Sequence, residues 1–246
     1  MIKTDYAAWV DAFEAEKERR AALGDPDWQR GADLPPEIVR SIQKFQVGED
    51  GDGSALLGKA DRAGDPVYSG AARLFVAEEQ NHARMLALLL AAGGAGVLDG
   101  HWSDAAFVRV RRLLGLRVEL LVLMIAEVVA LAYYRALADG AVDPLTREVA
   151  GRILADEQRH VPFHCLRLRE GLAHLPRPAR RAVTTAWRAL LGCAGLLVAV
   201  DHGAALRTLG TGRRSFVAEV VRSSAPMASA MADGPAPGPV GARMAV

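Results

Sequence analysis

The sequence predicts an all-α protein built around a bundle of helices. Apolar residues recur at helical spacing along most of the chain, whereas β-branched residues nowhere alternate with polar ones over a useful length. Asp65-Pro66 and Asp143-Pro144 each provide an N-cap followed by a proline in the first helical turn. Apolar residues make up 51% of the 246 residues, which is enough for a chain that buries a substantial core.

The first 35 residues are expected to form an N-terminal helix and a connector. Thr4 or Asp5 can cap a short helix, because an amphipathic segment follows directly. Its apolar face includes Tyr6, Trp9, Val10 and Phe13. Residues 24–35 are rich in glycine, aspartate and proline, a composition typical of an irregular connection.

One helical domain is expected over residues 36–222. Its four long helices are expected at about residues 36–62, 66–93, 103–140 and 144–175, followed by a fifth at 178–208 and a short sixth at 213–222. Ser103 or Asp104 would start the third helix, and Pro162 should kink the fourth. The tail 223–246 lacks a periodic apolar face and is expected to be disordered.

Glycines interrupt the first long helix against its propensity. They are Gly48, Gly51, Gly53 and Gly58. One interpretation is a locally irregular helix that packing tolerates. The other is functional: absent side chains around Glu49 would leave room for a substrate or an access channel.

An internal repeat carries the chemistry of the sequence. Two sets of three residues lie 78 positions apart: Glu49, Glu79 and His82, then Glu127, Glu157 and His160. Residues three apart share one face of a helix, so each Glu-x-x-His can direct a carboxylate and an imidazole at one point. In an antiparallel hairpin the lone glutamate meets that point at the same level. The chain therefore looks like two helical hairpins that each supply three metal ligands.

Glu127 is the sharpest of these residues. It is the only charged residue in the run Leu120–Tyr134, and an unpaired buried carboxylate is costly. A core glutamate paired with an arginine is the alternative. A single Glu-x-x-His is a weak signal, but two matched copies with matched lone acids predict a two-metal centre. Carboxylates and imidazoles without thiolates suit iron or manganese.

The connection between the two hairpins is longer than a short turn would need. A simple hairpin would put the next ligand near residue 109, which is an arginine, and Glu127 lies 18 residues further on. This excess predicts a connection that crosses the length of the bundle.

The pattern resembles that of the ferritin-like di-iron carboxylate proteins, in which two helices each supply a glutamate and two supply Glu-x-x-His. The resemblance covers about residues 36–175 and implies a ferritin-like four-helix bundle with one long crossover plus additional N- and C-terminal helices. It implies metal-bridging roles for Glu79 and Glu157, and terminal ligation by Glu49, His82, Glu127 and His160. An acid that precedes the motif often orients a ligating imidazole in relatives. Glu78 and Asp156 are therefore candidates, with Asp156 supporting His82 across the bundle.

The leading functional hypothesis is a di-iron oxygenase or oxidase. The resemblance favours two iron ions over manganese, with O2 as co-substrate, a small organic substrate and a separate electron donor. An apolar lining would exclude water from the ligands; it is expected from Phe75, Val76, Leu86, Leu120, Leu123, Met124, Ala130 and Leu131. The alternatives are ferritin- or bacterioferritin-like ferroxidase or iron storage activity, manganese catalase-like peroxide decomposition, and a structural bundle with a vestigial site.

Charge and composition argue against several partners. The 30 basic and 29 acidic side chains nearly cancel, so no general attraction to nucleic acid or to an anionic membrane is expected. Two cysteines, Cys165 and Cys193, are too few for a disulfide scaffold, and no signal peptide is visible, so a cytoplasmic location is expected. Leu120–Tyr134 and Leu190–Val200 are too short to cross a bilayer, so stable membrane insertion is not expected. A homodimer is compatible with all of this.

Polar residues outside the repeat have structural interpretations. Glu119 is expected to pair with Arg112 or Arg117 on the surface of its helix. Asp201 and His202 are expected to form a capping or structural pair.

Two side chains close to the expected ligands could serve either packing or chemistry. His164 follows His160 by one turn and could bind metal or substrate, but a buried or surface-bonded histidine is preferred. Tyr134 lies two turns beyond Glu127 and could be a redox-active phenol, with core packing as the preferred interpretation.

Overall fold

Helical periodicity in the sequence becomes a succession of helices, and the described residues contain no strand. The structure is a computed structural model and describes residues 5–100 and 115–232. Its helices are α1 (Tyr6–Leu23), a short 3-10 helix η1 (Trp28–Arg30), α2 (Pro36–Glu49), α3 (Ser54–Arg62), α4 (Pro66–Ala92), α6 (Leu116–Gly140), α7 (Pro144–Leu172), α8 (Arg177–Asp201), α9 (Gly203–Thr208) and α10 (Arg213–Ala232). The all-α prediction is confirmed for the described part of the chain.

Both aspartate–proline signals start helices where the sequence places them. The Asp65 carboxylate accepts hydrogen bonds from two backbone N–H groups in the first turn of α4. The Asp143 carboxylate accepts one from the N–H of Thr146 in α7. Each cap satisfies backbone donors that have no partner inside the helix, and the proline that follows lacks an N–H altogether. These caps fix the register of the two helices that carry Glu-x-x-His.

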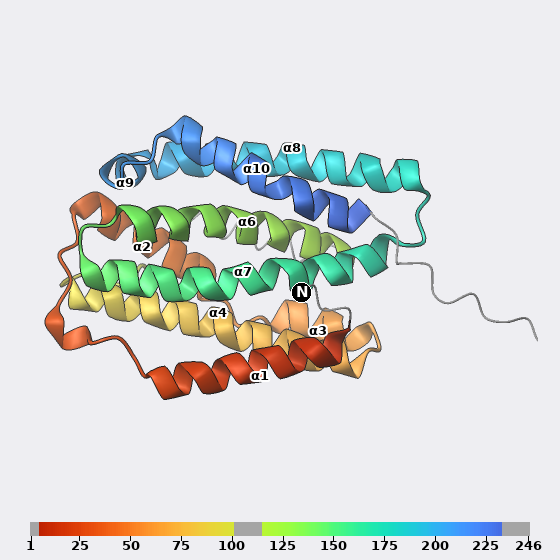
Figure 1. The fold of residues 1–246 in the computed structure, drawn as a ribbon, viewed down its shortest axis with the longest axis horizontal. Helices are drawn as coiled ribbons and strands as arrows, with labels where there is room; N and C mark the ends of the chain where they lie inside the picture. Colours follow the sequence, from red (N-terminus) through yellow and green to blue (C-terminus); the bar gives the residue numbers. More distant parts are fainter. Residues whose placement is uncertain (1–4, 101–114, 233–246) are drawn as a thin grey trace, which may run out of the picture.

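The directions of the helices match two hairpins joined by a crossover. α2 and α4 run antiparallel, as do α6 and α7, whereas α4 and α6 run in the same direction (Figure 1). The ends joined by residues 93–115 therefore lie at opposite ends of the helices, as the predicted crossover requires. The predicted start of the third long helix at Ser103 or Asp104 lies outside the described residues.

The prediction of one continuous helix over residues 36–62 is wrong. α2 ends at Glu49 and α3 begins at Ser54. Gly53 adopts a left-handed φ of 65°, and a Cβ there would lie 2.5 Å from Val76 Cγ1 on α4. The break therefore needs glycine for both its conformation and its close contact. It leaves Glu49 as the last residue of α2.

Helices α1, α8 and α10 cover opposite sides of the group formed by α2, α4, α6 and α7 (Figure 1). On one side, the rings of Trp9 and Phe13 from α1 contact Phe163 of α7 at centroid distances of 5.7 and 5.4 Å. On the other, the indole N–H of Trp187 in α8 donates to the backbone carbonyl of Leu121 in α6 at 2.9 Å. α10 packs on α6, α7 and α8.

The C-terminal helices differ from the sequence prediction. The expected fifth helix breaks at His202, which separates α8 from α9. The expected sixth helix is longer, because α10 continues to Ala232, and the prediction of disorder is wrong for residues 223–232. Buried residues at helical spacing explain the continuation: Val220, Ser224, Ala228 and Met231. Alanine is a strong helix former, so a segment poor in large apolar residues can still pack as a helix.

Truncation tests the role of this second half of α10. Ending the chain after Arg222 should lower Tm by about 5 °C or more, because buried contacts of Ser224, Ala228 and Met231 are lost. Ending it after Ala232 keeps those contacts and serves as the control, with Tm close to that of the full chain. Thermal unfolding followed by circular dichroism gives both values. Equal Tm values for the two truncations would contradict a packed role for residues 223–232.

Candidate metal centre

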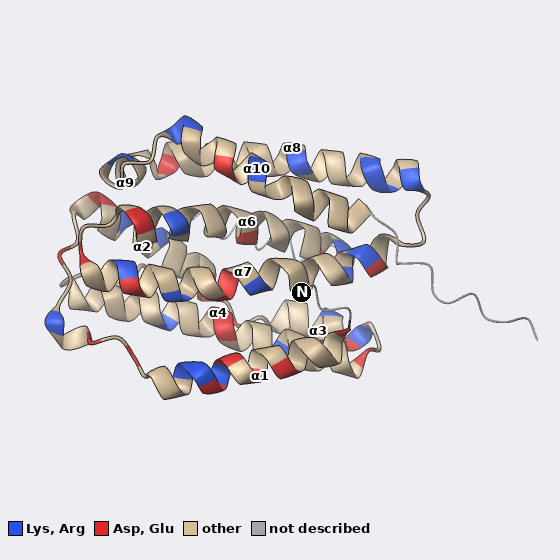
Figure 2. Ribbon diagram, in the orientation of Figure 1, with Lys and Arg blue, Asp and Glu red and all other residues tan. Residues whose placement is uncertain are grey.

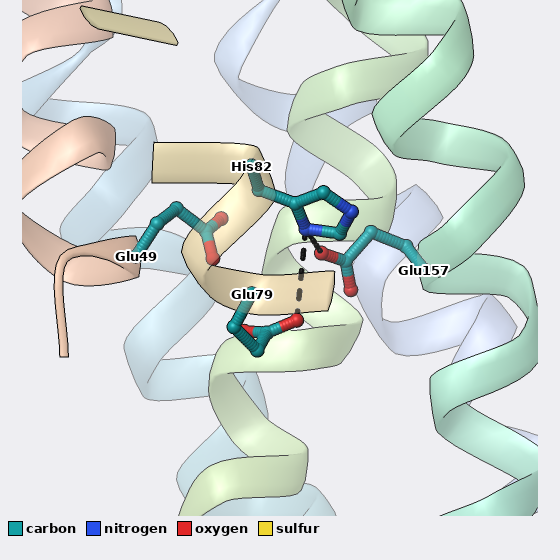
Figure 3. A group of neighbouring side chains, drawn as sticks. All are labelled: Glu49, Glu79, His82 and Glu157. Atoms are coloured by element: carbon teal, nitrogen blue, oxygen red, sulfur yellow. Dashed lines mark ion pairs between the residues drawn. The ribbon is translucent and has the colours of Figure 1, made fainter. Parts of the chain in front are cut away.

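The six predicted ligands come together between four helices. α2 supplies Glu49, α4 supplies Glu79 and His82, α6 supplies Glu127, and α7 supplies Glu157 and His160. They form two groups, each with ligand atoms within 4.8 Å of one another: Glu49, Glu79, His82 and Glu157, and then Glu79, Glu127, Glu157 and His160. Glu79 and Glu157 belong to both groups, as the bridging roles implied by the resemblance would require. Figure 3 shows the first group, with the carboxylates converging on the His82 ring.

Each imidazole turns one nitrogen toward the carboxylates of the cluster. His82 Nδ1 lies 3.3 Å from Glu157 Oε1 and 3.6 Å from Glu79 Oε1. His160 Nδ1 lies 3.0 Å from Glu79 Oε1 and 3.5 Å from Glu127 Oε2. Two nitrogens and four carboxylates thus face a common space, each at a distance that a cation between them could bridge.

Several of these buried atoms have no hydrogen-bond partner among the described residues. They are Glu79 Oε1, His82 Nδ1, Glu127 Oε2, Glu157 Oε2 and His160 Nδ1. Buried polar atoms of this kind are rare in folded proteins, because each one loses its hydration without replacement. Their concentration in a set of oxygen and imidazole donors fits a buried cluster that could hold a metal ion.

The outer nitrogen of each imidazole meets an acid from the opposite helix. His82 Nε2 lies 3.1 Å from Asp156 Oδ2, the contact that the sequence predicts for Asp156. His160 Nε2 lies 2.9 Å from Glu78 Oε2. When Nε2–H donates to these acids, the Nδ1 lone pair remains available for a metal ion. The acid before each motif therefore orients the imidazole of the other motif.

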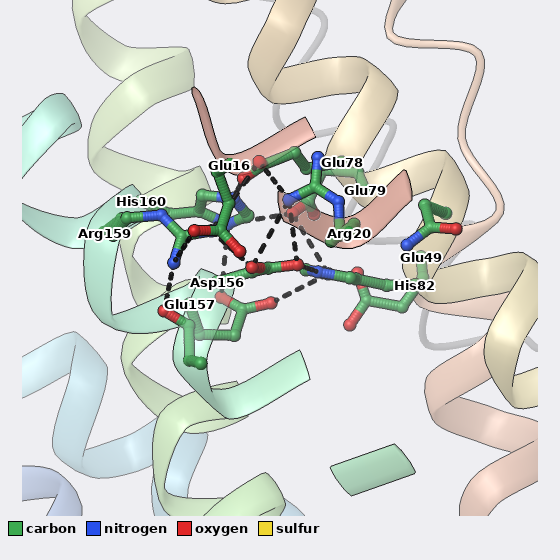
Figure 4. A network of polar contacts seen from close by, with 12 residues as sticks. Glu16, Arg20, Glu49, Glu78, Glu79, His82, Asp156, Glu157, Arg159 and His160 are labelled. Atoms are coloured by element: carbon green, nitrogen blue, oxygen red, sulfur yellow. Dashed lines mark hydrogen bonds and ion pairs between the residues drawn. The ribbon is translucent and has the colours of Figure 1, made fainter. Parts of the chain in front are cut away.

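Arg20 and Arg159 hold this pair of outer acids. The Arg20 guanidinium contacts Glu78 and lies 3.5 Å from Asp156, and Arg159 contacts Asp156 as well (Figure 4). Burial alone would raise the pKa of Asp156, but His82, Arg159 and Arg20 together lower it to about 2. Burial would also raise the pKa of Glu78, but its cationic neighbours, His160 first, lower that pKa below its usual value. Both acids are therefore anionic acceptors.

Sequence reasoning missed Arg20, which it placed in a separate N-terminal segment. A signal was available, since Arg20 lies seven residues beyond Phe13 and so on the same buried face of α1. An arginine on an apolar face that docks onto another helix is a candidate partner for a buried acid. The N-terminal helix thus contributes charge to the centre as well as packing.

The acids and imidazoles of the cluster perturb one another strongly. Burial, followed by the charge of Glu157, raises the pKa of Glu127 to about 8. Burial and then Glu79 and Glu157 raise the pKa of Glu49 well above its usual value. Burial opposes protonation of His82, but the surrounding carboxylates, Asp156 first, raise its pKa well above the usual value. Without metal, protons therefore occupy part of the cluster, and a bound metal ion would displace them.

Tyr134 packs in the core and also contacts a candidate ligand. Its hydroxyl donates a hydrogen bond to Glu49 Oε1 at 2.6 Å. Burial, followed by the negative charge of Glu49, raises the pKa of Tyr134 well above its usual value, so the phenol remains a donor. This contact orients a carboxylate that stands at the end of a helix.

The remaining polar predictions have mixed outcomes. His164 is buried against Phe75, with ring centroids 4.5 Å apart, and belongs to neither ligand group. Burial, followed by the charge of His160, lowers the pKa of His164 to about 3, so its ring is neutral. The surface role predicted for Glu119 is wrong, because Glu119 is fully buried and pairs with Lys59 of α3.

His202 makes a structural contact that joins distant helices. Its Nδ1 lies 2.8 Å from Ser41 Oγ of α2, and Ser41 also bonds to the hydroxyl of Tyr133 at 2.8 Å. His202 Nε2 lies 3.4 Å from Asp201, the predicted pairing. The break after α8 is thereby tied to α2 and α6.

A cavity of about 340 Å³ opens beside the cluster. Four of the ligand carboxylates line it: Glu49, Glu79, Glu127 and Glu157. Most of the other lining is apolar or glycine. Four of the eight predicted apolar residues line the cavity: Phe75, Val76, Leu123 and Ala130. The other four are core residues elsewhere: Leu86, Leu120, Met124 and Leu131. Gly48, Gly51 and Gly53 also line the cavity, which favours the interpretation that these glycines leave space near Glu49. Gly58 does not.

Comparisons of the chain with protein-family models, with curated proteins and with solved structures find no significant match.

Neutralising Asp156 tests the role of the outer acids. Asp156→Asn keeps a hydrogen-bond acceptor near His82 but removes the charge that raises the basicity of the ring, so Fe(II) affinity should fall by about 10- to 100-fold. Competition with a chromophoric chelator measures this affinity. Asp61→Asn is a matched control, because Asp61 pairs with Arg73 at an exposed site. Equal affinities for the Asp156 variant and the wild type would rule out this role.

Replacing Glu127 should separate stability from metal binding. The pKa of Glu127 is about 8 in the fold against 4.5 for the ordinary carboxyl, so its ionisation increasingly destabilises the metal-free protein as pH rises between these values. Metal-free Glu127→Gln should therefore have a Tm at least about 2 °C above that of the metal-free wild type near pH 8. The same variant should bind less metal.

Calorimetry of metal-free samples checks the first expectation and elemental analysis the second. Glu14→Gln, at an exposed position of α1, is the control and should change neither. A lower Tm for metal-free Glu127→Gln would show that the buried carboxylate is stabilising by itself.

Proposed function

We propose that this protein is a di-iron oxidase or oxygenase that uses O2 and acts on a small, apolar organic substrate. The observation that carries the proposal is the cavity, because the carboxylates of the candidate ligands form part of its wall and most of the rest is apolar. The six ligands proposed are Glu49, Glu79, His82, Glu127, Glu157 and His160. Their resemblance to the ferritin-like di-iron carboxylate pattern supports iron over manganese.

The chain itself would provide orientation, exclusion of water and proton control. Two bound Fe(II) ions would supply electrons to O2. Asp156 and Glu78 fix the rotamers and tautomers of the two imidazoles, and Tyr134 holds the Glu49 carboxylate. The apolar wall limits the access of water to the reacting region and strengthens electrostatic interactions there.

The cavity lining also indicates the kind of substrate. Apart from the ligand carboxylates, its ionisable side chains are Lys44 and His202. The Lys44 ammonium lies 2.7 Å from Asp201, and His202 contacts Ser41. Lys44 is therefore a neutralised cation rather than a ready anion site, which favours an uncharged substrate. A volume of about 340 Å³ lies at the small end of ligand-binding cavities.

Iron storage makes a different demand on the same ligands. Storage requires metal ions to leave the bundle repeatedly, which needs a polar route. The wall beside Glu127 is apolar: Leu123, Ile125, Ala126, Val129 and Ala130 line the cavity there. Such a wall favours retention of the metal as a cofactor.

The reaction with O2 tests the proposal. Protein loaded anaerobically with Fe(II) should hold about two irons per chain, consume O2 once, and need external reductant before it reacts again. An oxygen electrode and iron analysis after desalting measure both quantities. His160→Ala should lose at least one iron and the reaction, whereas His174→Ala, at an exposed position beyond α7, should keep both. Soluble protein that retains tens of irons per chain in air would support storage and exclude the proposal.

A further inference from the structure

Helix α8 exposes an apolar face opposite the one that it buries. Its buried residues pack toward the bundle: Arg180, Thr184, Trp187, Leu191, Gly195 and Ala199. Four large apolar side chains are exposed on it: Leu190 (61%), Leu196 (56%), Leu197 (55%) and Val200 (55%). Smaller exposed residues continue this face toward the N-terminus of the helix: Ala182, Ala186, Ala189 and Cys193. An apolar surface that extends about 28 Å along one helix marks an interaction site.

The contacts of α8 indicate that it lies on the bundle and does not leave it. By length and composition it is the one helix in the described residues that could cross a membrane, and 28% of its apolar window is buried. Here Trp187 bonds to Leu121, and a Cβ on Gly195 would lie 3.1 Å from Val220 of α10, so the inner face is closely packed. The outer face alone is available to a partner.

The layer formed by α8, α9 and α10 has a strong excess of positive charge. Residues 177–232 contain eight arginines and two acids, Asp201 and Glu219, although the whole chain has 30 basic and 29 acidic residues. Both acids are paired, with Lys44 of α2 and Arg135 of α6 respectively. Figure 2 shows blue segments along these three helices, with red segments concentrated in the helices below them. The near-neutral chain is therefore polarised, with its basic side at α8.

The cavity of the candidate metal centre extends to the same helix. Ala194, Leu197 and Val198 of α8 line it. Leu197 is 55% exposed as well, so the exposed face of α8 and the cavity wall share this side chain. A molecule bound to the apolar face would thus lie beside the way into the cavity.

We propose that the exposed face of α8 docks on the surface of an anionic lipid membrane. The apolar residues would enter the interfacial region while the exposed arginines of α8, α9 and α10 contact acidic headgroups, as in amphipathic helices that lie in the membrane plane. Arg181 of α8 and Arg214 of α10 are exposed, and their long side chains can reach headgroups, whereas Arg188 donates a hydrogen bond to Ser224 of α10. An apolar substrate dissolved in the lipid would then have a short path to the cavity; this last step alone rests on the proposed function.

A second copy of the chain fits the same face less well. Pairing two α8 faces about a two-fold axis would bring two layers with six excess positive charges each together, which is unfavourable. An anionic lipid surface converts those charges into an attraction.

Vesicle sedimentation with the full chain tests the proposal. Protein should sediment with vesicles of phosphatidylcholine mixed with phosphatidylglycerol, and at least about tenfold less with phosphatidylcholine alone. Leu190→Glu/Val200→Glu should reduce binding to the anionic vesicles by at least about tenfold. The control Val67→Glu/Val142→Glu makes the same chemical change at exposed positions of α4 and the α6–α7 turn and should bind like the wild type.

A second pair of variants tests the charges. Arg181→Gln/Arg214→Gln should weaken binding by about tenfold, whereas Arg62→Gln/Arg147→Gln, away from this layer, should have little effect. Binding that does not require acidic lipid overturns the proposal. So does loss of a dimer in the glutamate variant without any vesicle binding by the wild type, which would make α8 a contact between copies. Metal-free protein should bind equally well, so this test is independent of the proposed reaction.

Discussion

Burial of four carboxylates between helices is the constraint on which the rest of the structure depends. Glu49, Glu79, Glu127 and Glu157 lie close enough to repel one another in a region where water cannot screen them. Only two imidazoles share that space, so the cluster by itself retains excess negative charge or takes up protons. Cations at the centre of the cluster or arginines at its edge can balance this negative charge. The chain provides the arginines.

This constraint explains why the accessory helix α1 is part of the centre. Arg20 of α1 contacts both outer acids, Glu78 and Asp156, and together with Arg159 it offsets the two negative charges that these acids add to the cluster. The same two acids hold His82 and His160 through Nε2. The arginines therefore contact the outer acids, the outer acids contact the imidazoles, and the imidazoles face the inner carboxylates. Each of these groups stabilises the charged form of the group next to it. Replacing an arginine or an outer acid should therefore change the protonation of the group that it contacts.

The sequence sufficed for features that depend on spacing along a single helix. Both proline-initiated helices, the convergence of the six repeat residues and the contact of Asp156 with His82 follow from helical geometry applied to an internal repeat. Features that depend on which surfaces meet were not predictable in this way. The contact of Arg20, the burial of Glu119 against Lys59 and the contribution of α8 to the cavity join segments far apart in the chain. The second half of α10 was missed because small residues give a weak periodic signal even where they pack.

The repeat makes the two ligand groups alike, but the backbone makes them different. Glu127 lies in the middle of the continuous helix α6, so its position is fixed by hydrogen bonds on both sides. Its counterpart Glu49 is the last residue of α2, at the glycine-bearing break, and a single hydrogen bond from Tyr134 orients its carboxylate. A carboxylate at a helix end can change its orientation without breaking intrahelical bonds, whereas one in mid-helix is limited to its side-chain rotamers. Gly48, Gly51 and Gly53 line the cavity next to Glu49. The ligand group that contains Glu49, whose carboxylate can reorient more easily, therefore also has the most space around it. An asymmetric centre has therefore arisen from a symmetric ligand pattern through the break at residues 50–53.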